Sequence, residues 1–229
     1  MEQISLNNLM RRVVTILDTP VKFVLIVMLV ITLIFVGELI AEYLQRRVIN
    51  IKASSVIDAI RVGNSNPSTI IKNSGLLVKQ KRLLLGITLH DKLSNDMIEN
   101  YAVSLMENYN QDLDWSLRKT ELIAKLGPTF GLLGTLIPLG PGIIALSQGD
   151  TATLSYSLLA AFDTTVIGLI SGSICTIISM IRRRWYAKDR IMLTLILEAV
   201  LEKEKENREK GIKSKVGVKT LSSTKTKEV

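Results

Sequence analysis

Long uninterrupted runs of apolar residues dominate the hydrophobic pattern of this chain, and three of them are long enough to cross a membrane. They cover residues 21–41, 122–146 and 154–181. At 1.5 Å per residue, even the shortest run forms a helix of about 31 Å, which matches the thickness of a hydrocarbon core. The pattern therefore predicts an all-α integral membrane protein with three transmembrane helices.

The second and third runs are separated by residues 147–153, which include Gln148, Gly149 and Asp150 but no Lys or Arg. Two spans joined by so short a connection must run antiparallel, so we expect a helical hairpin with a tight turn. Pro138 and Pro141 in the second run predict a bend near that turn.

The segments outside the runs also have helical patterns. Apolar periodicity begins after Ser94 and continues without Gly or Pro into the second run, and Pro20 fits the first turn of the first span. The predicted segments are an amphipathic segment (1–20), a first span (21–41), a helical domain (42–121), a second span (122–146), a turn (147–153), a third span (154–181), a helical extension (182–210) and a disordered basic tail (211–229).

The distribution of charge predicts an orientation. The formal net charge is +8, and the last 48 residues contain 14 basic against 7 acidic residues. Arg182, Arg183 and Arg184 directly follow the third span, whereas the hairpin turn has no basic residue. The positive-inside rule then places the C-terminus and residues 42–121 in the cytoplasm, and the turn and N-terminus outside. A basic segment beside an apolar span favours contact with anionic lipid over nucleic-acid binding.

Candidate chemistry is sparse. The chain has one His and one Cys, Cys175, which lies within the third span. These counts exclude an internal disulfide and a cluster of His and Cys metal ligands. We find no nucleophile with its base and no phosphate-binding loop, so we predict neither an enzyme nor a bound cofactor or metal.

Small residues form a narrow stripe along each helix of the hairpin. Because such residues let membrane helices approach closely, we predict helix packing at Gly127, Gly131, Gly134, Gly168 and Gly172. Threonines share these stripes, and their hydroxyls have two uses that the sequence leaves open. They can bond to the backbone of their own helix, or they can line a polar path.

Asp163 is the one acidic residue within the third run. An ionised carboxylate there costs at least a few kcal/mol, so it requires a partner, water or a proton. It either fixes a helix contact in its protonated or Thr-bonded form, or it relays a proton or cation. The predicted pathway for a transported proton or sodium ion comprises Thr135, Asp163, Thr164 and Thr165.

Two segments of the hairpin resemble the MotA/TolQ/ExbB proton channel family. They are LGPTFGLLGT at residues 126–135 and AAFDTTVIGL at residues 160–169. The resemblance is detailed over residues 116–184, and the architecture of the whole chain is similar to that of the TolQ/ExbB branch. It implies a homopentamer around two copies of a single-span partner similar to ExbD, TolR or MotB. Ion flow would drive movement of that partner, and Thr135 and Thr165 match the threonines that face it.

The chain departs from the ExbB-like pattern at Ala160, where those members carry a glutamate. Asp163 lies three residues later and points to nearly the same side of the helix, so we hypothesise that it replaces this acid. The resemblance makes an ion-driven motor subunit in the inner membrane the leading function. The alternative is a non-conducting membrane scaffold with a helical cytoplasmic interaction domain.

Overall fold

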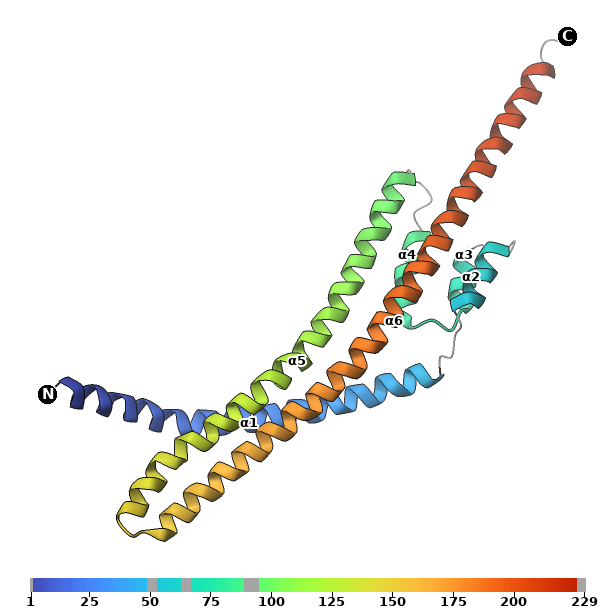
Figure 1. The fold of residues 1–229 in the computed structure, drawn as a ribbon. Coiled ribbons are helices and arrows are strands. Elements are labelled where there is room, and N and C mark those ends of the chain that lie inside the picture. The colour runs from blue at the N-terminus through green and yellow to red at the C-terminus, as the bar shows by residue number, and fades with distance from the viewer. Residues whose placement is uncertain (1, 49–52, 63–66, 89–94, 226–229) are drawn as a thin grey trace. The chain divides into compact units, whose positions relative to one another are not determined.

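The computed structural model describes residues 2–48, 53–62, 67–88 and 95–225, and all regular structure in these ranges is helical. The described residues form six helices, which are drawn in Figure 1. Their bounds are α1 (Glu2–Val48), α2 (Ala53–Val62), α3 (Pro67–Asn73), α4 (Val78–Thr88), α5 (Asn95–Ser147) and α6 (Thr151–Lys225). The chain divides into a span unit (residues 1–44 and 114–184) and a bundle unit (residues 45–113 and 185–229).

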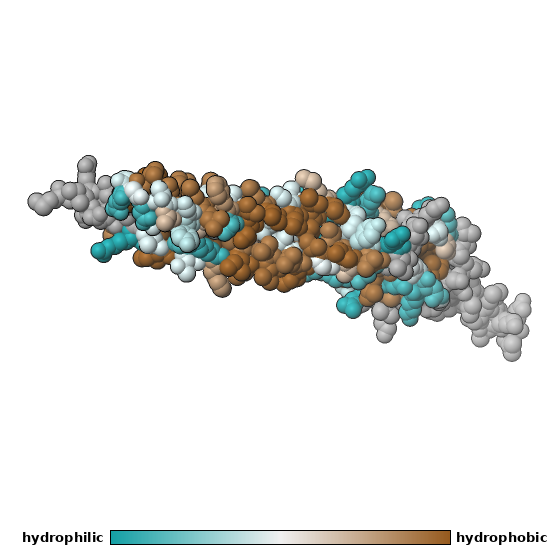
Figure 2. Space-filling model, turned by 90° about the horizontal axis from the view of Figure 1, so that it is seen from below, coloured by the Kyte–Doolittle hydropathy of each residue, from teal (hydrophilic) through white to brown (hydrophobic). Residues whose placement is uncertain are grey.

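The span unit contains the three predicted membrane segments. Three helical segments are long and apolar enough to cross a bilayer, namely Arg12–Arg47, Asp96–Ser147 and Thr151–Arg208, and the predicted spans lie inside them. Many of their large apolar side chains, such as Phe23 and Leu132, are exposed, and Figure 2 shows apolar residues gathered along the helices. This surface suits lipid or other apolar helices as its surroundings.

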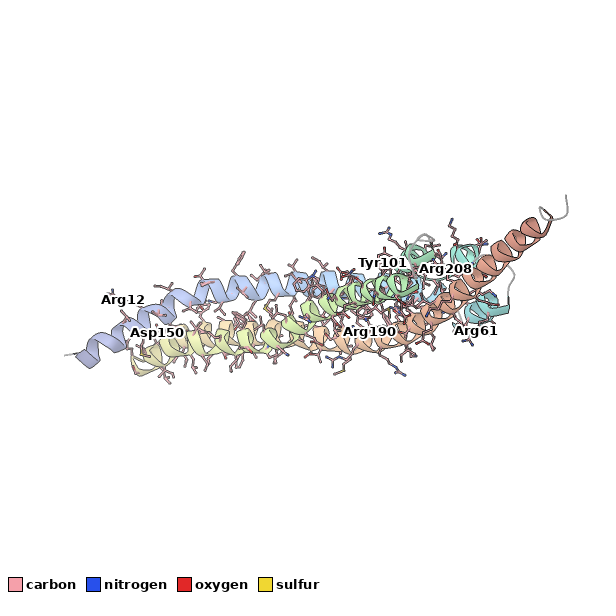
Figure 3. All side chains as sticks on the ribbon, turned by 90° about the horizontal axis from the view of Figure 1, so that it is seen from above. Arg12, Arg61, Tyr101, Asp150, Arg190 and Arg208 are labelled. Carbon is pink, nitrogen blue, oxygen red and sulfur yellow. The ribbon has the colours of Figure 1, made fainter. Side chains whose placement is uncertain are left out.

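Two predicted helix boundaries are wrong. Pro20 does not lie in the first turn of the helix that contains the first span, because α1 is continuous from Glu2 and contains this proline in its interior. A proline there removes one backbone hydrogen bond, and α1 bends in its N-terminal part (Figure 3). An ion pair between Lys22 and Asp18, 2.6 Å apart, bridges the same turn. Helix α6 does not stop at residue 210 but reaches Lys225.

The hairpin turn is shorter than the predicted 147–153. Helix α5 ends at Ser147 and α6 begins at Thr151, with Gly149 between them at a positive φ of 77°. Asp150 caps α6, since its carboxylate accepts hydrogen bonds from the Thr153 hydroxyl (2.6 Å) and the Thr153 amide (3.0 Å). Figure 3 places Asp150 at this turn, toward the same end of the span unit as Arg12.

The bundle unit has its own apolar core. Side chains from α2, α3, α4, α5 and α6 form it, and the most deeply buried are Ile60, Ile71, Leu84, Leu193 and Ile196. Beside this core the Arg46 guanidinium donates two hydrogen bonds to Asp189, at 2.6 and 3.1 Å, and lies over the ring of Trp185. The predicted helix start at Ser94 lies outside the described residues.

The Asp150 cap generates a test. The two hydrogen bonds from Thr153 hold the pKa of Asp150 below its usual value, so the cap is complete at neutral pH and is lost only as the pH falls through the lowered pKa. We expect Asp150→Ala to fray the first turn of α6, because it leaves the Thr153 amide without its acceptor. Faster hydrogen exchange at residues 151–154 would show this. Asp150→Asn keeps an acceptor and should retain most of the protection.

Candidate ion-pathway site

Helices α5 and α6 touch backbone to backbone at a set of glycines. A Cβ atom added at Gly127 would lie 2.7 Å from the carbonyl oxygen of Gly168 and 2.9 Å from the amide nitrogen of Gly172. A Cβ at Gly168 would lie 2.5 Å from the carbonyl oxygen of Gly127 and 2.7 Å from the Cα of Gly131. Only glycine fits these positions at the observed spacing, so the hairpin geometry depends on them.

Nearer the turn, the contact pairs a glycine with a threonine. A Cβ at Gly134 would lie 2.6 Å from both the Cβ and the Oγ1 of Thr164. Thr164 is buried, and its hydroxyl donates to the carbonyl oxygen of Ala161 at 2.9 Å. Thr164 therefore fills the hairpin interface in this protomer and is not open to an ion.

The other two threonines use their hydroxyls differently. Thr135 donates to the carbonyl of Leu132 in its own helix at 2.6 Å. The hydroxyl of Thr165 crosses from α6 to α5 and donates to the carbonyl of Gly131 at 3.3 Å. Both side chains are half-buried. The sequence leaves open whether these hydroxyls bond to their own helix or line a polar path. In the structure Thr135 bonds within its own helix, whereas Thr165 links the two helices.

Asp163 lies on a different side of α6. It is exposed, and it makes no hydrogen bond or ion pair with any residue that the structure describes. Neighbours on its face are the exposed apolar side chains of Leu159, Val166 and Ile170. Because successive residues of an α-helix are about 100° apart, Asp163 points almost opposite to Thr165. One protomer therefore does not bring Asp163 together with Thr164 or Thr165.

A second polar cluster was missed by the sequence analysis. Arg182 has a side chain only 3% exposed, and it pairs with Glu38 at 3.0 Å and with Glu42 at 3.5 Å, both on α1. Its guanidinium also donates to Ser116 of α5 at 3.5 Å. By its sequence position, Arg182 is a flanking charge of the third span. Two glutamates one turn apart at the end of the first span were the signal for a buried cation.

Two further polar contacts join the spans. Ser179 of α6 donates to Thr120 of α5 at 2.9 Å, and both residues are buried. Thr32 of α1 lies 3.5 Å from the Cys175 sulfur of α6. The described residues include no group of three His, Cys, Asp or Glu side chains that could hold a metal ion. The chemistry of this site is therefore that of hydroxyls, one outward carboxylate and one buried ion cluster.

These features define a helical membrane protein whose last two spans form a glycine-packed hairpin with an outward-facing carboxylate. The model of the MotA/TolQ/ExbB proton channel family matches residues 64–193, which is more than half of the chain. The chain belongs to this family, and it is a multi-pass membrane protein with the general role of an ion-channel motor subunit. A search of the curated proteins finds no match. The matched range includes Thr135, Asp163, Thr165 and Arg182.

The glycine contacts can be tested with one substitution at two positions. We expect Gly168→Ala to destabilise the hairpin by about 1–3 kcal/mol, because its new methyl group would meet the α5 backbone. Gly140→Ala is the matched control, since nothing lies within 4 Å of a Cβ there. Thermal unfolding in detergent should show a lower midpoint for the first variant and no loss for the second. Equal midpoints would contradict the close backbone contact.

Proposed function

We propose that this protein is the channel-forming subunit of a proton- or sodium-driven motor complex. Several copies, five by family resemblance, would surround a single-span partner, and ion flow would move that partner to perform transport or envelope work. The proposal places the complex in the inner membrane, with the hairpin turn and N-terminus outside and the C-terminus in the cytoplasm. Family membership supports the channel role, and the basic residues after the third span support the orientation.

The observation that carries this proposal is the outward position of Asp163 on an apolar face. Leu159, Val166 and Ile170 surround it, so the ionised form has nothing in its own protomer to offset the cost of leaving water. Binding a proton removes that cost. During ion-driven movement this carboxylate would meet in turn an apolar neighbour and a polar or cationic group of another chain. Alternation between these two neighbours would link each proton to a step of movement.

A ring of copies reconciles Asp163 with the threonines. Thr165 faces α5 within its own hairpin, whereas Asp163 points away from it. In a ring, the outward side of one α6 meets a neighbouring copy or the partner, so the path would run between chains and not through one hairpin. Thr135 is half-buried, and its hydroxyl can rotate from the Leu132 carbonyl toward such a path. This role for Asp163 corresponds to that of the family glutamate, in whose place this chain has Ala160.

Replacing Asp163 tests the relay. We expect Asp163→Asn to reduce ion flux by about 100-fold or more, because the amide cannot exchange a proton. Asp163→Glu keeps a carboxylate and should retain part of the flux. The measurement is dye-detected flux in vesicles that contain the protein together with a single-span protein that copurifies with it.

Asp150→Asn is the control for this experiment, since Asp150 lies in the turn outside the spans. It should leave flux unchanged, and unchanged flux in Asp163→Asn would exclude the relay.

The hydroxyl bonds of Thr135 and Thr164 to backbone carbonyls are what a packing role requires, and this favours the scaffold as the second candidate. A wild-type complex that carries no flux with its partner present would select the scaffold.

A further inference from the structure

The cluster around Arg182 contains one base and two acids. Arg182 Nη2 lies 3.0 Å from Glu38, and its Nε lies 3.5 Å from Glu42. Burying an unpaired guanidinium costs several kcal/mol, so Arg182 needs at least one acid at all times. One carboxylate would satisfy its charge. The second acid therefore requires an explanation other than neutralisation.

The base and the acids differ in their freedom to move. Arg182 is 3% exposed, whereas Glu42 is 22% and Glu38 is 53% exposed. Ser116 of α5 also accepts a hydrogen bond from Arg182, at 3.5 Å, so the base is attached to the hairpin. Both acids lie on α1, four residues apart and therefore on one face, about 6 Å from each other along the helix. The arrangement is one fixed cation beside two alternative anions on a separate helix.

We propose that Arg182 is a positioning residue in a two-step joint between α1 and the hairpin. Either Glu38 or Glu42 can hold Arg182, so α1 can shift along α6 by up to one turn without leaving a buried charge unpaired. The hairpin can then change its position during ion-driven work while α1 stays attached. The mechanical part of this inference rests on the proposed function, whereas the exchange of acids does not.

The first experiment tests the exchange of acids by thermal unfolding of the full-length protein. Glu38→Gln and Glu42→Gln should each lower the midpoint slightly, because the remaining acid still pairs with Arg182. The double variant should lower it by much more than the sum of the two. Adding Arg182→Gln to the double variant should recover most of the loss, because no buried charge is left.

The ion pair between the exposed Arg183 and Glu121 supplies the control for this cycle. Arg183 is 69% exposed, so Glu121→Gln should have little effect and should add independently to either single variant. The double variant could also fail to accumulate as folded protein in the cell. If adding Arg182→Gln then restores the amount of folded protein, that result also supports the joint. Additive losses from the two acids, or one acid that accounts for the whole effect, would overturn it.

The second experiment fixes the register of α1 reversibly. Thr32 lies 3.5 Å from Cys175, the single cysteine of the chain, so Thr32→Cys allows a disulfide between α1 and α6. We expect oxidation to abolish ion-driven activity and reduction to restore it. Thr32→Cys in a Cys175→Ala background should keep its activity under both conditions.

Full activity in the oxidised protein, with disulfide formation verified by loss of reactive thiols, would overturn the mechanical part of the inference. If the reduced and wild-type proteins carry no ion flux, the proposed function fails instead. The unfolding cycle still decides whether the two acids exchange, so the two failures can be told apart.

Discussion

The backbone contact between Gly127 and the pair Gly168 and Gly172 is the constraint on which the hairpin depends. Within a membrane, burial of apolar surface gives helices little reason to associate, so close packing must supply the attraction. At these positions the two backbones leave no room for a Cβ atom. The four-residue repeat of glycine on each helix extends this contact over one full turn. Ser179 and Thr120 add a buried hydrogen bond on the same pair of helices.

This contact also decides which polar groups remain outside. Thr164 and Thr165 lie in the hairpin interface because they face α5. Thr164 packs on Gly134, and Thr165 donates a hydrogen bond to the Gly131 carbonyl. The same rotation of α6 turns Asp163 outward among apolar side chains. A carboxylate in that place has no partner within its own hairpin. The packing of the hairpin therefore leaves this carboxylate on the outer, apolar face of α6, away from the threonines.

Local sequence features were sufficient for the spans and the hairpin, because the length of the apolar runs and the shortness of the connection between the last two are readable along the chain. The ends of the helices were harder to predict. Pro20 was read as a helix start, but a long apolar helix and the Asp18–Lys22 pair tolerate its missing hydrogen bond. Asp163, Thr164 and Thr165 are predicted as parts of one ion pathway, whereas their directions around α6 separate Asp163 from the two threonines. Arg182 has the sequence position of a flanking charge, and its acidic partners are more than 100 residues away along the chain.

Arg182 and Asp163, two charged residues of the span unit, differ in how the membrane cost of their charge is offset. Arg182 is buried, and two acids and a serine from other helices surround it, so its charge is offset within the chain and holds the three spans together. A guanidinium keeps its proton in proteins, so a buried one requires anions close by, and Glu38 and Glu42 supply them. Asp163 instead lies exposed among apolar side chains and makes no hydrogen bond or ion pair with any residue that the structure describes. The contacts within the described residues thus offset the charge of Arg182 and leave that of Asp163 without a partner.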